Sequence, residues 1–402
     1  MTPGALARFL FEAHPEYRVD HLDPGVCKYR EILRETHGLV RSSDGVLSFS
    51  GAGRSIEGRE IPVVTIGSGS RHILFWSQMH GDESTATLAL MDMFRLLSSG
   101  GLPALILKPI LSRTSLHVVP MLNPDGAERV MRQTSAGIDM NRDARALVTP
   151  EARFLRRLQR RLKPSFGFNL HDQEISSVGS SKNVTAIALL APAADEQERK
   201  GAVRRRAMRV AVLIARALDP FAGGHISRYD DAFEPRAFGD NMQLWGTSTI
   251  LIESGHWPND PAKHFIRRLN FVSLLTAAYS IATGAYLRTS VDGYDSLRKN
   301  GKRAYDVIVR RVNLLRAPRG SSRVDLGLSL EPGQNRGRGG WEDTTILRVK
   351  EIGDLRGFGA VTMLDGNGAK VNSEELGVEQ KVTWGRLCEQ VNASNKKKMG
   401  LT

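Results

Sequence analysis

A histidine and a glutamate three residues apart, His80 and Glu83, follow shortly after the apolar run 73–76. The apolar run predicts a buried strand, and the pattern of apolar residues over 84–98 predicts a helix. In an open α/β sheet, ligands bind beyond the carboxyl ends of the strands, so both side chains lie where a site is expected. Imidazole and carboxylate groups bind metal ions, but a single pair with this spacing also occurs by chance in many proteins.

Three further apolar runs lead into polar or charged residues. The runs 116–122, 166–170 and 249–252 are followed by Asn123-Pro124-Asp125-Gly126, His171 and Glu253, respectively. Burying a charged or imidazole group is costly unless the group is paired or bound to a metal. These residues are therefore candidates for the same site as His80 and Glu83.

Each of these residues also has an ordinary structural explanation. A lone histidine such as His171 is more often a core residue that a neighbour satisfies, and Glu253 also suits the N-terminus of a following helix. The segment 123–126 is typical of a turn. Arg142, further along the chain, is also explained as one more surface cation. Four such explanations would have to hold together, which favours a shared functional site.

The order of these residues resembles that of the M14 (carboxypeptidase A-like) zinc carboxypeptidases. Five separated elements agree in order and residue type: His80-x-x-Glu83, Asn-Pro-Asp-Gly at 123–126, Arg132 with Gly-Ile-Asp-Met-Asn-Arg at 137–142, His171 and Glu253. The resemblance covers roughly residues 55 to 285. About 30 residues separate Arg142 from His171, which leaves little room for long loops and is closer to the compact bacterial branch.

The resemblance implies a zinc centre with one metal ion per chain. His80, Glu83 and His171 would be the protein ligands, a set that leaves one position open for water. Zinc lowers the pKa of bound water and polarises a substrate carbonyl. Glu253 would act as general base toward the water and then as the acid that protonates the leaving amine. Arg132 would stabilise the oxyanion that develops on the carbonyl.

The same resemblance assigns residues to substrate binding and to orientation of the ligands. Asn141 and Arg142 would bind the free carboxylate of the substrate, because a guanidinium matches a carboxylate in bidentate fashion. Asp139 would fix the ring of His80. Tyr229 is the candidate for the tyrosine that covers the substrate in many family members, although a core or surface tyrosine is an equally good explanation.

The chain is strongly basic. It has 56 basic and 43 acidic residues, a formal net charge of +13, and arginine clusters at 153–163 and 204–209. Solvated helix faces explain these clusters best, and attraction to an anionic polymer is the alternative. Arg228 and Arg236 are either surface cations, which we favour, or part of a pocket for an acidic side chain. No nucleic-acid-binding motif accompanies the charge, so nucleic-acid binding is the weaker hypothesis.

Length and composition indicate an ordinary folded protein. The 402 residues predict two or three domains, and 41% hydrophobic residues is enough for sizeable cores. No apolar run is long enough to span a membrane. The N-terminus lacks the features of a signal peptide, which favours a cytoplasmic location; a periplasmic or secreted location is the alternative if a leader was removed. Cys27 and Cys388 indicate neither a disulfide framework nor a metal site, and nothing indicates an oligomeric state.

Strand and helix patterns alternate through the middle of the chain, which predicts an α/β fold with a mixed, mostly parallel sheet and helices on both faces. Strands are expected at 72–77, 116–122, 166–171, 184–190 and 248–253, and helices at 84–98, 150–162, 197–218 and 261–286. Residues 1–50 are expected to be a helical lead-in to a hairpin with its turn at 51–61, and residues 51–289 the catalytic domain.

Residues 290–402 are expected to form a small β-rich domain with a frayed basic tail at 396–398. Strands are expected at 306–309, 324–328, 345–349 and 359–363, with a Gly- and Arg-rich loop at 331–340. No catalytic constellation occurs in this part of the sequence.

The residues therefore predict a zinc-dependent metallocarboxypeptidase that hydrolyses a peptide or peptide-like amide bond next to a free carboxylate. An amidase or deacylase of N-acyl amino acids, or an enzyme that acts on cell-wall peptides, is the alternative on the same fold. A non-catalytic basic protein that binds nucleic acid or another anionic polymer is the alternative of a different class. The complete ligand set with Glu253 argues against that last alternative.

Overall fold

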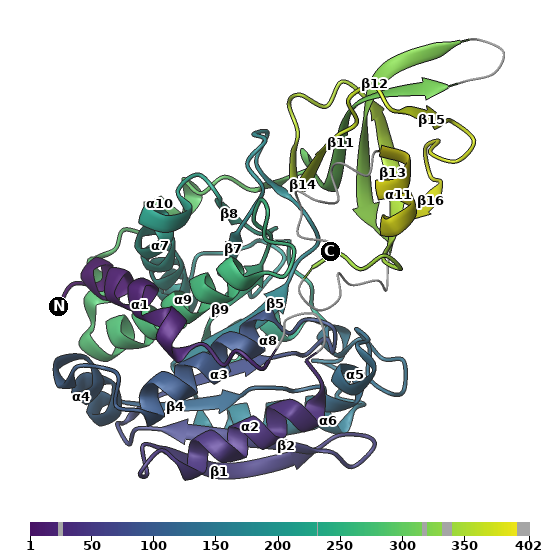
Figure 1. The fold of residues 1–402 in the computed structure, drawn as a ribbon. Coiled ribbons are helices and arrows are strands. Elements are labelled where there is room, and N and C mark those ends of the chain that lie inside the picture. Colours follow the sequence, from purple (N-terminus) through teal and green to yellow (C-terminus); the bar gives the residue numbers. More distant parts are fainter. Residues whose placement is uncertain (23–26, 231, 316–319, 332–339, 392–402) are drawn as a thin grey trace.

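The computed structural model describes residues 1–22, 27–230, 232–315, 320–331 and 340–391. Nearly all of the loop expected at 331–340, and the whole lysine tail, lie outside these ranges. The described chain forms a large α/β unit and a smaller β-sheet region that follows it in sequence (Figure 1). None of the helices in the described ranges is long and apolar enough to cross a membrane.

The large unit is built on an eight-stranded sheet in the order β1-β2-β4-β3-β5-β9-β7-β8. Its strands are β1 (Leu47–Arg54), β2 (Glu60–Ile66), β3 (Arg71–Ser77), β4 (Thr114–Val119), β5 (Phe166–Asp172), β7 (Ile187–Leu190), β8 (Ile226–Arg228) and β9 (Ser248–Ser254). The central strands β4, β3, β5 and β9 run parallel, whereas β2 is antiparallel to β4 and β7 is antiparallel to β9. The predicted mixed sheet is confirmed.

Helices cover both faces of this sheet, because successive strand residues point to opposite faces. On β3, Phe75 joins the larger core, whereas Leu74 and Trp76 join a smaller one. The larger core includes residues of α1 (Pro3–Tyr17), α2 (Tyr29–Arg41), α3 (Thr85–Ser98), α4 (Ala104–Arg113), α7 (Ala202–Ala222) and α9 (His264–Thr283). The smaller core includes residues of α6 (Pro150–Leu162) and α8 (Phe238–Leu244).

The turn expected at 51–61 is wrong in its first part, because β1 continues to Arg54. The register of β1 against β2 shifts between Phe49 and Gly51, so Gly51 belongs to a β-bulge rather than to a turn. A Cβ atom on Gly53 would lie 2.5 Å from the ring of Phe154. Glycine at this position therefore lets α6 pack closely on the strand.

Other element boundaries differ from the sequence predictions by a few residues. The strand expected at 116–122 runs from Thr114 to Val119, and the one expected at 184–190 is confined to 187–190. Helix α7 begins and ends about four residues later than predicted. Helices α4 and α8 were not predicted; α4 contains Pro109, and α8 is only 7 residues long.

The C-terminal region forms a second sheet with its own apolar core, which confirms the predicted β-rich addition. Its elements are β11 (Ala304–Leu315), β12 (Ser321–Leu330), β13 (Ile346–Gly353), β14 (Gly359–Asp365), β15 (Lys370–Asn372), β16 (Lys381–Thr383) and α11 (Trp384–Val391). The short strand β10 (Asn300–Gly301) pairs with β6 (Ser177–Val178) of the large unit. The backbone N–H of Asn259 also donates to Val361 O at 2.7 Å, so the second sheet contacts a loop that follows β9.

Candidate metal centre

His80 and Glu83 lie in the short connection between β3 and α3, at the carboxyl end of a central strand. The side-chain Nε2 of Gln78 donates to Gly81 O at 2.8 Å, which holds the connection in a tight fold. A Cβ atom on Gly81 would lie 2.1 Å from the carbonyl carbon of Gly126. Glycine at position 81 therefore allows this loop to pack directly on the next polar segment.

That next segment, 123–126, begins a helix instead of forming the expected turn. Asn123 is the N-cap of α5 (Pro124–Arg129), and its Oδ1 accepts a hydrogen bond from the backbone N–H of Gly126 at 2.9 Å. Its side-chain amide donates to the carbonyl groups of Arg132 and Gln133 at 3.4 and 3.1 Å. Asn123 thus fixes the position of the loop that carries Arg132.

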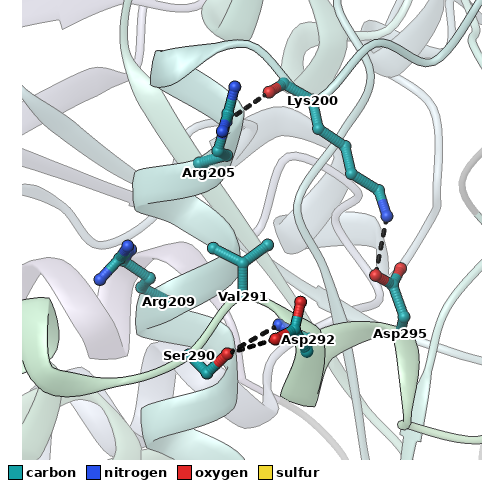
Figure 2. A pocket seen from close by; sticks show the side chains of 7 residues that line it. All are labelled: Lys200, Arg205, Arg209, Ser290, Val291, Asp292 and Asp295. Carbon is teal, nitrogen blue, oxygen red and sulfur yellow. Dashed lines mark hydrogen bonds and ion pairs between the residues drawn. The ribbon is translucent and has the colours of Figure 1, made fainter.

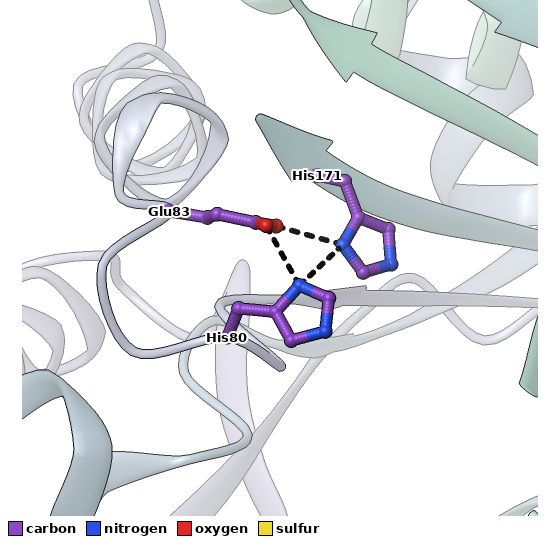
Figure 3. A group of neighbouring side chains, drawn as sticks. All are labelled: His80, Glu83 and His171. Atoms are coloured by element: carbon purple, nitrogen blue, oxygen red, sulfur yellow. Dashed lines mark hydrogen bonds and ion pairs between the residues drawn. The ribbon is translucent and has the colours of Figure 1, made fainter. Parts of the chain in front are cut away.

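Three metal-binding side chains meet in one buried cluster. The Nδ1 atom of His80 lies 2.7 Å from Glu83 Oε1, and the Nδ1 atom of His171 lies 2.7 Å from Glu83 Oε2. The two Nδ1 atoms are 3.2 Å apart. Figure 3 shows all three groups converging on one point, and their ligand atoms lie within 4.8 Å of one another. The predicted ligand set is therefore assembled in space.

The hydrogen-bond partners of His80 leave acceptor atoms of the cluster facing one another, an arrangement that suits a bound cation. Its Nε2 atom lies 3.0 Å from Asp139 Oδ1, which places the ring proton of the neutral form there and leaves Nδ1 as an acceptor. That acceptor faces the Glu83 carboxylate and His171. Burial disfavours a charged ring, yet Glu83 and Asp139 raise the pKa of His80 to about 9. The carboxylates thus favour a positive charge at this point, which a metal ion bound by His80, Glu83 and His171 would supply.

Glu253 lies beside the cluster because its strand is the parallel neighbour of the strand that carries His171. His171 on β5 pairs in register with Glu253 on β9, and the two residues are 2% and 6% exposed. Within the described residues, Glu253 Oε2 is buried without a hydrogen-bond partner. The residue lies inside the strand, and the next helix begins at His264, so the helix-cap explanation is excluded.

The environments of the two buried glutamates push their pKa values in opposite directions. Burial opposes ionisation of Glu83, yet His80 and His171 hold the pKa of its carboxyl well below the usual range. Burial, and then the charge of Glu83, raise the pKa of the Glu253 carboxyl well above its ordinary value. Opposite shifts in neighbouring carboxyl groups are typical of an acid–base site in which one group stays ionised and the other exchanges a proton.

Arg132 lies at the rim of the cluster and is anchored on both acids there. Its Nη1 donates to Glu83 Oε1 at 3.1 Å, and its Nε and Nη2 donate to Asp139 Oδ2 at 3.3 and 3.2 Å. Its side chain remains 41% exposed. The structure therefore places a fixed guanidinium within reach of both the cluster and solvent.

Asn141 and Arg142 follow Asp139 in a 3₁₀ turn, η1 (Met140–Arg142). Their side-chain bonds within the described part of the chain go to Phe238 and Glu234 and to the backbone of the turn, not to the three ligands. Asn141 Oδ1 accepts a hydrogen bond from the backbone N–H of Phe238 at 3.0 Å. The guanidinium of Arg142 is 42% exposed and lies 3.5 Å from Glu234. Arg236 forms shorter bonds to the same Glu234 carboxylate, at 2.9 and 2.7 Å. Two guanidinium groups thus share one acid beside the site.

Tyr229 is the tyrosine that the family resemblance assigns to the substrate, and the charge of Glu253 acts on it. It directly follows β8 and is half-buried. The charge of Glu253, and then burial, raise the pKa of Tyr229 to about 12. Arg228 instead contacts Asp295 at 3.4 Å and lies over the ring of Tyr294, so its side chain serves packing, and the pocket role considered for it gains no support.

Two residues that the sequence interpretation missed support the cluster. The backbone N–H of Asp172 donates to Glu83 Oε2 at 3.2 Å, and the Asp172 carboxylate accepts from Thr85 and from Lys263 Nζ at 2.5 and 3.0 Å. Asp172 comes directly after His171, and that adjacency was a usable signal. Lys263 lies in the loop before α9, and no pattern in the neighbouring sequence indicates that it belongs to the site.

The arginine cluster at 204–209 does not join this site. The expectation of a fully solvated face is wrong for Arg204, which is 3% exposed and donates to Ala191 O at 2.9 Å. Arg205 and Arg209 line a separate cavity of about 540 Å³. Figure 2 shows that acids share this cavity, including Asp295, which binds Lys200 at 2.7 Å. This cavity therefore contains both basic and acidic groups and lies apart from the metal centre.

Residues 32–181 match the family model described as zinc carboxypeptidase, peptidase M14. This segment therefore resembles the M14 zinc carboxypeptidases. The match contains His80, Glu83, Arg132 and His171, whereas Glu253 lies outside it. This family uses zinc, and the cluster of His80, Glu83 and His171 can hold one metal ion.

Solved structures share the fold at low sequence identity. A metallo-carboxypeptidase from Burkholderia cenocepacia matches with a TM-score of 0.50 and 14% identity, over 62% of this chain and 69% of that one. Carboxypeptidase A from Helicoverpa armigera matches with a TM-score of 0.50 and 16% identity, over 65% and 74% of the two chains. These likenesses show that the chain has the carboxypeptidase fold.

A curated relative is similar over a shorter segment. Gamma-D-glutamyl-L-diamino acid endopeptidase 1 from Lysinibacillus sphaericus is 31% identical over 84 residues, which are 20% of this chain. The match spans 21% of the relative's own length.

Proposed function

We propose that this M14-related protein is a zinc-dependent metallocarboxypeptidase that cleaves a peptide or peptide-like amide bond next to a free carboxylate. The observation that carries the proposal is the buried cluster of His80, Glu83 and His171 with Glu253 paired in register beside His171. This arrangement combines a His₂Glu ligand set with a carboxyl group of raised pKa, which is what metal-assisted hydrolysis needs.

Each residue of the site has its own role in the proposed hydrolysis. A zinc ion, when bound, supplies Lewis-acid chemistry that lowers the pKa of water and polarises the substrate carbonyl. A carboxylate oxygen of Glu253 takes a proton from the attacking water and then passes it to the nitrogen of the leaving amine. The fixed guanidinium of Arg132 donates to the carbonyl oxygen as negative charge develops there. The ring of Tyr229, whose pKa the charge of Glu253 raises, closes over the bound substrate.

Asn141 and Arg142 restrict cleavage to the end of the chain. Arg142 is half-exposed and holds Glu234 only at 3.5 Å, so a substrate carboxylate can replace Glu234 in the guanidinium fork. Arg236 already holds that glutamate by two shorter bonds and retains it after the exchange. The backbone bond from Phe238 to Asn141 fixes the turn from which both residues project.

Arg142→Ala should raise KM for peptides with a free C-terminus by about 10-fold to 100-fold, because a hydrogen-bonded ion pair contributes roughly 1.5–3 kcal/mol. Steady-state kinetics on matched pairs of free and C-terminally amidated peptides measures this effect. Arg113→Ala, which removes an exposed arginine at the end of α4, is the control. An equal loss on the free and the amidated peptides would contradict the anchoring role.

A cell-wall type of peptide is the second candidate substrate, and the curated relative favours it. That protein is described as a gamma-D-glutamyl-L-diamino acid endopeptidase. Parallel assays with an ordinary dipeptide, a γ-glutamyl-diamino acid peptide and an N-acyl amino acid distinguish the candidates. Cleavage of the γ-glutamyl peptide alone would replace the general carboxypeptidase with this narrower activity, and cleavage of the N-acyl amino acid alone would indicate a deacylase.

A further inference from the structure

The second sheet contains a strained bulge that places consecutive arginines in one cavity. The register of β11 against β12 shifts between Val309 and Val312, so Arg310 and Arg311 are the bulged residues. Arg311 has a φ of 59°, in the left-handed region that arginine rarely adopts. Successive residues of a regular strand point to opposite faces, yet both arginines line the same cavity of about 740 Å³.

Hydrogen bonds to Asp325 of β12 stabilise this bulge. The Asp325 carboxylate accepts from Arg310 Nη1 at 2.7 Å, from the backbone N–H of Arg311 at 3.0 Å and from that of Leu355 at 3.2 Å. Arg310 is thereby a structural residue with 20% side-chain exposure. The side chain of Arg311, by contrast, is 53% exposed. A bulge re-aims side chains, and bulges are over-represented at sheet edges and next to active sites.

Two further arginines come from other parts of the sheet. Arg323 of β12 and Arg356 of the loop after β13 line the same cavity. Arg356 pairs with Asp354, and Arg311 pairs with Asp365; both acids are about half-exposed, at 58% and 47%. Among the described residues, Arg323 forms no ion pair. Exposed ion pairs contribute only about 0–1 kcal/mol, so these guanidinium groups can exchange their internal acids for acids of a ligand.

We propose that this cavity is a binding site for an acidic peptide segment, whose carboxylates pair with Arg311, Arg323 and Arg356. Guanidinium groups match carboxylates in bidentate fashion, and the cavity already seats the carboxylates of Asp354 and Asp365 in that way. The wall also presents apolar surface: Met363 is 52% exposed and lines the cavity with Val324. A peptide covers such surface with its own carbon atoms, whereas a fully hydrated polyphosphate does not.

The site is separate from the proposed catalytic centre, because none of the cavity's lining residues belongs to that centre. The site gives the β-rich region a binding function that does not depend on hydrolysis. Its ligand is an acidic peptide, either free or as part of a larger molecule. The proposal and the proposed peptidase activity can therefore fail independently.

Fluorescence anisotropy with a labelled hexaglutamate peptide and the full-length protein tests the proposal. The double variant Arg311→Gly/Arg323→Ala removes two guanidinium groups, and glycine accepts the positive φ at position 311 without strain. We expect the Kd of this variant to rise by about tenfold, the effect of roughly 1.4 kcal/mol. Arg386→Ala, an exposed arginine of α11 in the same region, is the matched control and should bind as the wild type does.

Two further measurements sharpen the result. Hexalysine should not bind, and unlabelled inorganic polyphosphate should compete less well than unlabelled hexaglutamate. Equal Kd values for the double variant and the wild type would overturn the site. Preferential competition by polyphosphate, lost in the double variant, would overturn the choice of a peptide ligand. Retained hydrolysis of a small substrate by the double variant shows that the catalytic unit is intact.

Discussion

Glu253→Gln should lower kcat by about 10²-fold to 10⁴-fold while the protein keeps its fold and its zinc. The factor is typical for the loss of a general acid–base group. Glutamine has nearly the same shape, and Glu253 Oε2 has no hydrogen-bond partner among the described residues that the change would break. Because burial raises the pKa of this carboxyl, the ionised form is disfavoured in the folded protein, so the neutral amide should leave the thermal midpoint unchanged or slightly raised.

Single-turnover kinetics, metal content and thermal melting measured on the same preparations check this expectation. Asp172→Asn serves as a comparison that disturbs the surroundings of the cluster, because it keeps the backbone N–H that supports Glu83 but removes the charge that pairs with Lys263. Activity of Glu253→Gln within a few-fold of the wild type would move the general base to another residue. Loss of zinc in Glu253→Gln would instead make Glu253 a ligand.

Arg132→Ala should lower kcat by about 100-fold to 1,000-fold, as expected when a donor to the developing oxyanion is removed. The effect should fall on kcat rather than on KM, because the charge on the carbonyl oxygen exists only in the transition state. Arg132 also holds Glu83 and Asp139. Metal content must therefore be measured in parallel, and we expect it to be retained because all three ligands remain.

Arg132→Lys keeps the positive charge but loses the fork that spans both acids. We expect this variant to recover part of the lost kcat. A rise in KM at constant kcat for Arg132→Ala would show that the residue binds the ground state of the substrate. Its role would then resemble the one assigned to Arg142.

The site was predictable because the chemistry of this fold sits at strand ends, and apolar runs that end in polar residues are visible in a sequence. His80, Glu83, His171 and Glu253 all follow or end such runs. The sequence does not show in the same way that these four residues lie close together in space. Their proximity depends on the strand order β3-β5-β9, which is set by packing of the whole sheet rather than by any local pattern.

The parts that were missed depend on long-range contacts. Lys263 reaches Asp172, and Glu234 reaches Arg142, but each is one charged residue among many in a basic chain. The segment 51–54 resembles a turn in sequence because it contains two glycines. In the structure, Gly51 belongs to a β-bulge, and Gly53 leaves room for the ring of Phe154. Local propensity cannot separate these uses of glycine, because the reason lies in a partner far along the chain.

Arg142 and Arg236 both hold Glu234, so the pocket for a substrate side chain is not readable from residue types alone. The sequence pattern favoured Arg236 as a surface cation, and its exposed side chain agrees with that interpretation.

Metal content, measured by inductively coupled plasma mass spectrometry on the wild type and on His171→Ala, tests the central claim most directly. A catalytic site of three protein ligands predicts about one zinc ion per wild-type chain and its loss from the variant. A matched substitution of a histidine outside the cluster, His225→Ala, should retain the metal. A wild-type protein that binds no zinc, even after zinc is added back, would contradict the proposed hydrolase.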